Sequence, residues 1–245
     1  MAENSNWNFS NDNFNLFKNK DNIEDGDNMF QIIDNAKKNI LKEIFETGIK
    51  INYDNYKEYL FETNLFLFGS LEKNIEESVY CLIIGAYTAS ITNTNLILER
   101  AIKLALMQFN AKDLLNFSND DLIQKYIESD RKFSGKNLDQ NIQTCQSFKI
   151  FTEEEAKELK EYKLKFRDGF SHFTPKNILK GEKSLFNIPG VEKIDEKMSI
   201  YLKLPTYQAA EVMQFAINNA ENHLKYVLKI INHLQFKILD KFSQK

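Results

Sequence analysis

Late in the chain, the stretch KFRDGFSHF brings together three side chains that can do acid–base and phosphate chemistry: Arg167, Asp168 and His172. Histidine suits general acid–base work because its ordinary pKa lies near neutrality. A guanidinium binds two phosphate oxygens at once through its planar fork, and Asp168 could orient either the arginine or an imidazole tautomer. Together they suit metal-independent cleavage of an RNA phosphodiester, with attack by the 2′-hydroxyl and a cation that stabilises the developing charge.

The same three residues also fit an ordinary polar face of a helix. On an ideal α-helix, five positions separate Arg167 from His172, which is about 140° at about 100° per residue. The two side chains would therefore flank a groove rather than stack on each other. A Lys- and Glu-rich helix is commonly just a solvated face, on which Arg167 and Asp168 make a local ion pair. The sequence leaves both interpretations open.

The charge distribution favours a local anionic ligand. The net charge is −3 over 245 residues, so the surface as a whole does not attract nucleic acid. Residues 156–183, however, carry 8 basic and 4 acidic side chains, a local balance of +4. The basic ones are Lys157, Lys160, Lys163, Lys165, Arg167, Lys176, Lys180 and Lys183. A patch of this kind is what an RNA-binding protein of low overall charge needs.

Motifs for other chemistries are missing from the sequence. It holds no GxxxxGK[ST] or GxGxxG phosphate loop, no HExxH and no paired CxxC. With only 3 histidines, a His-rich metal site is not expected, and no cofactor is expected either. Cys81 lies in an apolar run that should raise its thiol pKa and leave it unreactive. His223 lies on an apolar stripe, where a core or dimer-interface role is expected, and His233, without an evident charged partner, has no assigned role.

The elements that must position these residues are expected to be helices. The chain has 8 Gly and 3 Pro, and the prolines all lie late, which favours long helices over many short strands. Apolar periodicity predicts helices over residues 29–45, 53–69, 70–109, 119–129, 137–150, 152–172 and 206–242. The fold class is therefore all-α.

Apolar stripes mark the faces of these helices that should be buried. The first expected helix has one at Phe30, Ile33, Ile40, Ile44 and Phe45, and the third has one at Ile91, Leu98, Ile102, Ala105 and Phe109. The run 79–87 is nearly all apolar and should be buried on most sides. The small polar residues at 88–95 indicate a close helix approach, a kink or a polar surface, and the sequence does not decide among these.

Capping signals set the expected boundary between the second and third helices, with Gly69 as the C-cap of one and Ser70 as the N-cap of the next. Within the third helix, Glu99 and Lys103 are spaced for an i,i+4 ion pair.

The helix that carries the candidate site has the clearest boundaries. Thr152 and Glu155 form a capping box, and Pro175 disfavours helical geometry at Thr174. We therefore expect this helix to end just after His172.

Three regions are expected along the chain. Residues 1–27 are rich in Asn, Asp and Ser and predict an irregular or disordered arm, residues 28–69 predict helices that pack on a bundle, and residues 70–245 predict the bundle itself. A connector at 174–205 contains MSIYLKL, a short strand or extended segment. Neither a transmembrane span nor a signal peptide is evident, and the two cysteines fit free thiols, so we expect a cytoplasmic protein.

The motif RDGFSH resembles that of the HEPN superfamily, R-[polar]-x(3–5)-H, which is found in many prokaryotic defence ribonucleases and toxins. Its position before a final long helix is also similar. An earlier segment, YCLIIGAYTASITNTNLILERAIKLALMQF, resembles the long early helix of that family with its E-R-A-x-K-like part. The resemblance covers about residues 70 to 242. It implies an up-and-down helical bundle, with additional N-terminal helices in this chain.

The resemblance also implies an activity. Arg167, Asp168 and His172 would take the functional positions of an RNA-cleaving cleft, formed where two motifs meet across a homodimer. The role would be antiviral defence by abortive infection or that of a toxin, with RNA as substrate and an antitoxin or phage-sensing protein as possible partner. Many toxin members have a Tyr two residues past the histidine, where this chain has Thr174. The alternatives are an inactive HEPN-like bundle that binds RNA, a nucleotide or a partner protein, and an unrelated structural protein.

Overall fold

The computed structural model describes residues 26–61, 63–112, 118–180 and 204–243. Within these ranges every regular element is a helix, which confirms the predicted all-α class. The chain divides into two compact units, residues 1–47 and 48–245. The predicted division into an arm, N-terminal helices and a bundle stays a prediction. Most of the expected arm and nearly all of the MSIYLKL segment lie outside the described residues.

The described part of the first unit is the N-terminal portion of α1 (Gly26–Tyr56). The helix forms where the apolar stripe predicted it, but the stripe is largely exposed to solvent. Phe30 is 72% exposed, Ile40 41% and Phe45 48%, while Ile33 and Ile44 are half-buried. Periodicity therefore predicted the helix correctly, and the larger side chains of its apolar stripe are exposed.

The remainder of α1 runs on to Tyr56, so the predicted break between helices at 29–45 and 53–69 is wrong. A glycine, Gly48, lies inside this helix because another backbone comes very close. A Cβ at Gly48 would lie 2.7 Å from the carbonyl oxygen of Ile83. Asn52, one turn later, donates its Nδ2–H to the same oxygen at 2.9 Å.

The chain between α1 and α3 does not follow the predicted caps. Helix α2 (Glu58–Phe61) is short, and Gly69 begins a 3₁₀ turn, η2 (Gly69–Leu71), instead of ending a helix. Helix α3 (Glu72–Ile83) starts without a side-chain cap, so the expected N-cap role of Ser70 is wrong. Phe68 and Leu71 are 1% and 0% exposed. Their burial accounts for the turn better than local capping does.

The third expected helix is two helices, α3 and α4 (Tyr87–Ala111), separated at Gly85, whose φ of 76° few other residues adopt. The two helices pack closely. The Ser78 hydroxyl lies 3.1 Å from that of Ser90 and 2.7 Å from that of Thr94. Among the alternatives for the small polar residues, a close helix approach therefore holds at these positions. The apolar run beside the break is only partly buried, since Tyr80 is 45% exposed.

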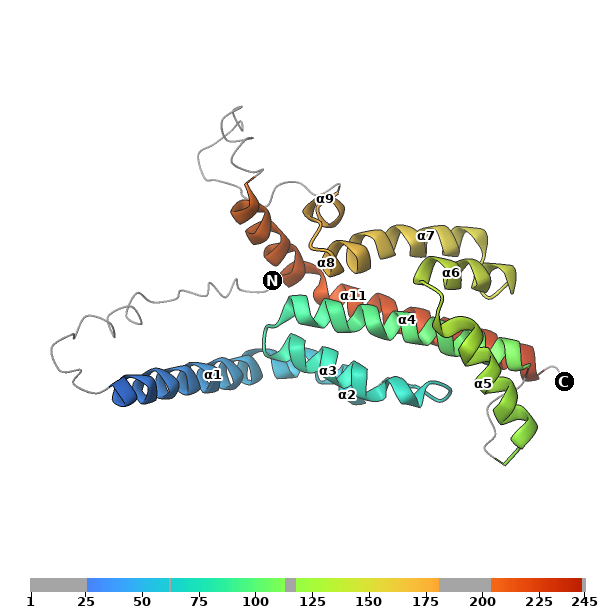
Figure 1. Cartoon of the computed structure of the whole chain (residues 1–245), viewed down its shortest axis with the longest axis horizontal. Helices are drawn as coiled ribbons and strands as arrows, with labels where there is room; N and C mark the ends of the chain where they lie inside the picture. The colour runs from blue at the N-terminus through green and yellow to red at the C-terminus, as the bar shows by residue number, and fades with distance from the viewer. Residues whose placement is uncertain (1–25, 62, 113–117, 181–203, 244–245) are drawn as a thin grey trace. The chain divides into compact units, whose positions relative to one another are not determined.

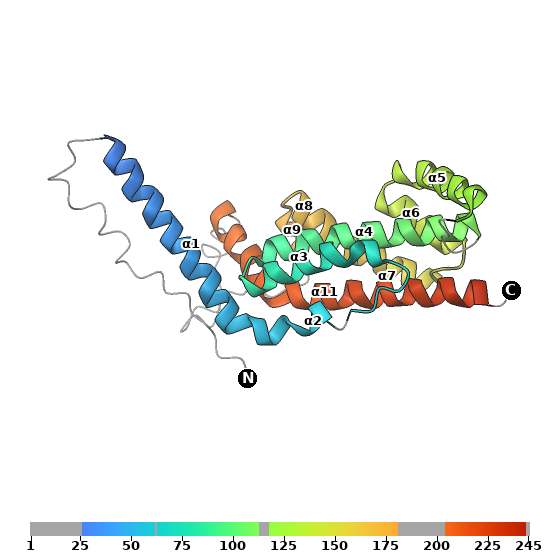
Figure 2. The same ribbon diagram turned by 90° about the horizontal axis from the view of Figure 1, so that it is seen from below.

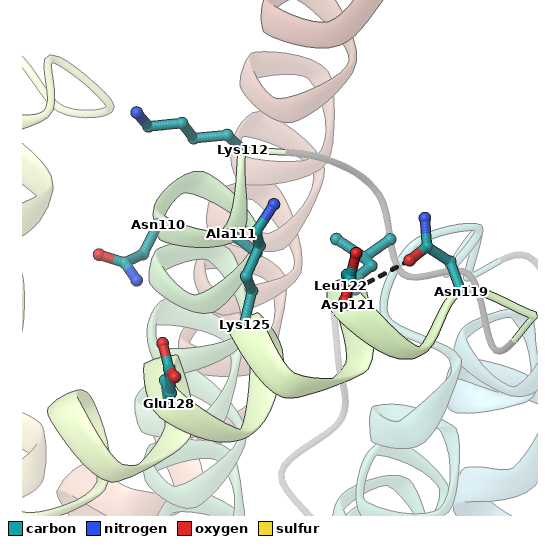
Figure 3. A pocket seen from close by; sticks show the side chains of 8 residues that line it. All are labelled: Asn110, Ala111, Lys112, Asn119, Asp121, Leu122, Lys125 and Glu128. Carbon is teal, nitrogen blue, oxygen red and sulfur yellow. Dashed lines mark hydrogen bonds between the residues drawn. The ribbon is translucent and has the colours of Figure 1, made fainter.

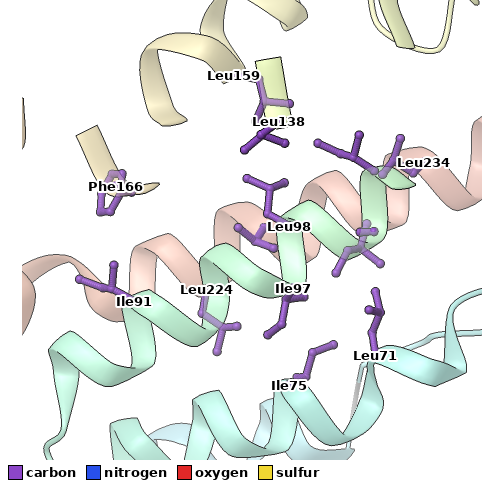
Figure 4. Packing of buried hydrophobic residues seen from close by; sticks show 14 of the residues in the cluster. Leu71, Ile75, Ile91, Ile97, Leu98, Leu138, Leu159, Phe166, Leu224 and Leu234 are labelled. Carbon is purple, nitrogen blue, oxygen red and sulfur yellow. The ribbon is translucent and has the colours of Figure 1, made fainter. Parts of the chain in front are cut away.

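Helix α4 is the centre of the second unit, and α11 (Pro205–Ser243) lies alongside it (Figures 1 and 2). The predicted stripe is confirmed: Ile91, Leu98, Ile102, Ala105 and Phe109 are at most 7% exposed. Figure 4 shows side chains of other elements on both sides of α4, with Phe166, Leu138 and Leu159 on one side and Leu71 and Ile75 on the other. A helix surrounded in this way is buried around most of its circumference.

The other helices of this unit match the sequence closely. They are α5 (Asp120–Ser134), α6 (Leu138–Ser147) and α7 (Glu153–Lys163), the last of which begins with the predicted capping box of Thr152 and Glu155. Helix α5 extends beyond its predicted end at residue 129. The long α11 confirms the last predicted helix. Within the described ranges, none of the helices has the length and apolar character needed to span a membrane.

Candidate functional site

The candidate residues lie where α7 changes geometry. After Lys163 the chain forms a π-helical turn, η3 (Leu164–Asp168), and then the short α8 (Gly169–Ser171). The N–H of Gly169 donates to the carbonyl of Leu164, five residues back. Such turns interrupt α-helices with one extra residue and are frequent at functional sites. The angular spacing of an ideal α-helix therefore does not hold between Arg167 and His172.

The helix ends at His172, as its sequence predicts. His172 is the C-cap of α8, and Phe173 follows in a left-handed conformation with φ of 43°. The N–H of Thr174 donates to the carbonyl of Gly169 at 2.7 Å. This bond and the left-handed residue are features of a Schellman motif. The predicted stop is therefore confirmed, and α9 (Pro175–Ile178) begins after it.

Buried polar contacts anchor the π-helical turn from beneath. Asn95 of α4 donates its Nδ2–H to the carbonyl of Phe166 at 3.0 Å. Its Oδ1 lies 3.0 Å from Nε2 of His223 on α11, and the other ring nitrogen of His223 lies 3.2 Å from the Tyr162 hydroxyl. The rings of His223 and Phe166 stack with centroids 4.4 Å apart and planes 4° apart. Four side chains from four elements (α4, α7, η3 and α11) thus hold the backbone that carries Arg167.

His223 is structural, as its place on an apolar stripe predicts. The residue is 0% exposed, and burial lowers its pKa to about 3, against a smaller opposing effect of a backbone hydrogen bond with Ile91. The imidazole is therefore neutral at physiological pH. A neutral ring that donates from Nε2 to the amide oxygen of Asn95 can accept at Nδ1 from the Tyr162 hydroxyl. Every polar atom of the ring then has a partner.

Arg167 is held by two carboxylates. Its Nε–H donates to Glu99 at 2.8 Å, and its Nη1–H donates to Asp168 at 3.1 Å. The i,i+4 ion pair expected between Glu99 and Lys103 does not form, because Glu99 faces Arg167. Lys103 instead reaches the carbonyl of Ser134 at 3.4 Å.

Lys163 completes the charged cluster. Its Nζ lies 2.6 Å from Asp139 of α6 and 2.7 Å from Asp168. Only 13% of its side chain is exposed. Asp168 therefore orients Arg167 and Lys163, which answers the question that the sequence left open. The cluster joins two cations to three carboxylates, a formal charge of −1.

These contacts shift the ionisation of the cluster. Partial burial by itself raises the pKa of Asp168, but the hydrogen bond and charge of Lys163, and then those of Arg167, outweigh it and lower the pKa below its ordinary value. The pKa of Arg167 is raised mainly by its hydrogen bond to Glu99. For Lys163, partial burial opposes the charged form, yet Asp139 and Asp168 raise its pKa overall. The pKa shifts of Asp168, Arg167 and Lys163 thus each favour the charged form.

His172 stands apart from this cluster. Its side chain is exposed, and in the described part of the chain it makes no hydrogen bond or ion pair. The structure thus joins Arg167 and Asp168 directly and leaves His172 open to solvent at the end of the same helical segment. Of the three candidates, only His172 has its whole side chain free of contacts with charged or polar partners in the described ranges, whereas Nε and Nη1 of Arg167 and the carboxylate of Asp168 are engaged.

The positive charge of the basic patch is partly neutralised in the folded chain. Lys163 and Arg167 are paired with carboxylates, two of which come from outside the patch. Lys183 lies outside the described residues. Lys176 and Lys180, just beyond His172, are exposed, and neither has a carboxylate partner among the described residues.

Sequence reasoning missed Glu99, Asp139 and Asn95 as parts of the site, and it identified Lys163 only as one residue of the basic patch. A signal existed for Glu99, which belongs to the E-R-A-x-K segment. Asn95 was visible only as one of several poor helix formers. The partners of Lys163 lie on another helix, and no local pattern identifies them.

Other polar features of the described residues have a structural explanation or no defined chemistry. A hollow of about 540 Å³ between the end of α4 and the start of α5 is lined by charges of both signs, Lys112, Lys125, Asp121 and Glu128 (Figure 3). No group of three His, Cys, Asp or Glu residues suited to a metal ion occurs in the described ranges.

The remaining histidine and the cysteines can also be placed. His233 lies 3.7 Å from Glu155, so the expectation that it lacks a charged partner is wrong. Burial raises the pKa of the Cys145 thiol, and burial followed by Glu77 raises that of Cys81, as predicted for Cys81. Both effects disfavour the reactive thiolate.

Comparison with protein-family models, curated proteins and solved structures finds no match for this chain.

Proposed function

We propose that the protein is a metal-independent endoribonuclease of the HEPN type, with Arg167 and His172 as catalytic residues and Asp168 in a supporting role. The observation that carries the proposal is an arginine fixed by Glu99 and Asp168, followed five positions later by a histidine at a helix end. The histidine is exposed, and its side chain has no partner among the residues that the structure describes. A fixed cation and an accessible imidazole are the two groups that cleavage by the 2′-hydroxyl needs. The sequence resemblance supplies the reaction class.

In the proposed reaction, the His172 imidazole removes the proton from a ribose 2′-hydroxyl. The 2′-oxygen then attacks the adjacent phosphorus, the bond from phosphorus to the 5′-oxygen breaks, and a proton is delivered to that oxygen. The products are a 2′,3′-cyclic phosphate and a 5′-hydroxyl end. The Nη2 group of Arg167, which has no partner among the described residues, would bind a non-bridging phosphate oxygen.

The reaction needs one group that removes a proton from the 2′-hydroxyl and one that delivers a proton to the 5′-oxygen, but a single chain supplies only one His172. A homodimer with two motifs at one cleft would supply a second imidazole. The biological role that follows from the resemblance is RNA cleavage in the cytoplasm during abortive infection or as a toxin, restrained by an antitoxin or triggered by a phage-sensing partner.

The test is RNA cleavage in the presence of EDTA. The purified chain should cleave total RNA and leave 2′,3′-cyclic phosphate ends, detected by end-specific ligation. His172→Ala and Arg167→Ala should each reduce the rate at least about 100-fold. His233→Ala is the matched control, because His233 lies on α11 among structural contacts, and it should cleave normally. Cleavage that persists in His172→Ala defeats the assignment.

A non-catalytic RNA-binding protein is the second candidate. It is favoured by the engagement of two guanidinium nitrogens with carboxylates in a cluster of formal charge −1. Such an arginine is less available to a phosphate than a free one. Under this alternative, no cleavage occurs at any protein concentration, while RNA binding is measurable.

A further inference from the structure

Phe173, directly after His172, is a large aromatic residue in an unusual place. Its side chain is 54% exposed, and its backbone φ is 43°. The left-handed conformation costs a residue with a Cβ about 1 kcal/mol, and at this position of a helix end glycine is the usual residue. Neither hydrophobic burial nor local backbone preference explains a phenylalanine here.

The backbone on both sides of Phe173 is firmly held. The N–H of Thr174 donates to Gly169 at 2.7 Å, which closes the helix end. Downstream, Ile178 is 0% exposed and packs so tightly on the helix that a Cβ at Gly169 would lie 2.6 Å from its Cγ1. The aromatic ring therefore projects from a fixed turn between two anchored segments. An exposed ring on a fixed support is pre-organised for a flat ligand.

Charge on the same segment favours an anionic ligand. Residues 171–180 include Lys176 and Lys180 and contain no acidic residue. Both lysines are exposed, and neither is paired with a carboxylate in the described ranges. An aromatic ring with exposed lysines on the same segment is the combination that binds single-stranded nucleic acid, in which bases stack on rings and cations contact phosphates.

We propose that residues 171–180 bind single-stranded RNA, with Phe173 stacked on an unpaired base and with Lys176 and Lys180 on the backbone phosphates. The proposal rests on the proposed ribonuclease function and names its substrate class. Base faces are accessible in loops and single strands but covered in a duplex. The site would thus select unpaired RNA next to His172.

The experiment uses the full-length chain and an RNA that cannot be cleaved. A fluorescein-labelled 12-nucleotide RNA with 2′-O-methyl groups throughout has no 2′-hydroxyl to attack, so binding is measured apart from chemistry. Its dissociation constant is obtained by fluorescence anisotropy, alongside that of the same strand annealed to its complement. The single strand should bind more tightly than the duplex.

Substitutions separate stacking from charge. Phe173→Ala should weaken single-strand binding at least about fivefold, the lower end of the effect of losing one base stack. Phe173→Trp should retain binding. Lys176→Ala with Lys180→Ala should weaken binding and reduce the slope of log Kd against log[salt], because released counterions set that slope. Phe173→Ala should leave the slope unchanged.

A glycine variant excludes misfolding as the cause of lost binding. Phe173→Gly removes the ring and also relieves the left-handed backbone, so it should lose RNA affinity while its melting temperature stays equal or rises. If the ring mattered only for folding, the loss of RNA affinity would be accompanied by a lower melting temperature.

The outcomes distinguish this inference from the proposed function. If Phe173→Ala or Phe173→Gly binds as the unaltered protein does, or if the duplex binds better, the inference is wrong, whether or not RNA is cleaved. Absence of binding by the unaltered protein also overturns it. If binding depends on Phe173 but total RNA is not cleaved, the inference stands and the ribonuclease proposal fails.

Discussion

Arg167 donates its Nε–H to the carboxylate of Glu99 at 2.8 Å, across 68 residues of sequence. Glu99 lies one turn beyond Asn95 on α4, and Asn95 binds the carbonyl of Phe166 in the same π-helical turn. One face of α4 thus fixes both the backbone and the guanidinium of the candidate site. The direction of Arg167 depends on a helix that the local motif does not contain.

We expect Glu99→Ala to impair the site more than Glu99→Gln. The amide oxygen of glutamine can still accept from Arg167, whereas alanine releases the guanidinium from its main restraint. RNA cleavage should fall at least tenfold in Glu99→Ala, and a double-mutant cycle with Arg167→Ala in thermal unfolding should give a coupling of about 1 kcal/mol. Lys103→Ala is the control and should have little effect. Full additivity of the two substitutions contradicts this assignment.

Replacing Lys163 by methionine should destabilise the fold although methionine keeps an aliphatic side chain of similar length. Lys163→Met leaves Asp139 and Asp168 without their shared cation, and we expect a loss of about 1–3 kcal/mol in the free energy of unfolding by urea. Lys157→Met, an exposed lysine of the same helix, should change stability by no more than about 0.5 kcal/mol. Equal effects of the two substitutions would show that the paired carboxylates do not matter.

His223 predicts a specific loss of stability in mild acid. Its pKa is about 3 in the folded chain, and histidine titrates near pH 6.5 in an unfolded one. Protons therefore bind the unfolded chain preferentially. The stability is fully present above about pH 6.5 and is lost as the pH falls toward 3, by up to about 1.4 kcal/mol per pH unit. Urea unfolding between pH 7.5 and 5 measures this slope.

The comparison for that slope is His223→Gln against His233→Gln. The first substitution should flatten the pH dependence, since no buried imidazole remains to be protonated. The second removes a half-buried histidine at the edge of α11 and should retain most of the dependence. An unchanged slope in His223→Gln would assign the acid sensitivity to other groups.

Gly169→Ala should destabilise the helix end that bears His172. Alanine is the better helix former by about 1 kcal/mol, but its Cβ would lie 2.6 Å from Ile178. We expect a net loss of about 1–3 kcal/mol in thermal or urea unfolding. Gly135→Ala is the matched control because no atom lies within 4 Å of the added Cβ, and it should be neutral or slightly stabilising.

A second substitution tests the cause. Ile178→Ala removes the atom that the new Cβ would meet, so the double variant should be less destabilised than the sum of the two single variants, by about 0.5–3 kcal/mol. Strict additivity would exclude the clash as the reason.

Much of the fold follows from local signals in the sequence. The capping box at Thr152 and the stop before Pro175 bound the helical segment that carries the site, and both are confirmed. The stripe that begins at Ile91 identified the buried face of α4 correctly. These features depend on residues within a few positions of each other, where backbone geometry dictates which side chains share a face.

Errors arose where distant contacts outweigh local preference. Periodicity predicted one helix over residues 70–109, but the chain breaks at Gly85, which has a positive φ. Two helices were predicted over 29–45 and 53–69, but α1 continues through Gly48, where the backbone of Ile83 packs too close for a Cβ. Serine is a favourable N-cap residue, yet Ser70 does not cap α3, because the burial of Phe68 and Leu71 determines the backbone path there. Capping is worth about 1 kcal/mol, and burial of two large side chains is worth more.

At the candidate site, the sequence by itself determined the order of the chemical groups along one helical segment: Arg167 next to Asp168, with His172 at the helix end. Only the tertiary structure decided their partners. Glu99 had Lys103 at ideal helical spacing, but the packing of α4 beneath the π-helical turn brings it to Arg167 instead. The reason is physical: an exposed i,i+4 pair contributes a few tenths of a kcal/mol, whereas a partly buried guanidinium that lost its carboxylate would cost more. The partial burial of Arg167 therefore favours its pairing with Glu99, and no short sequence pattern encodes that burial.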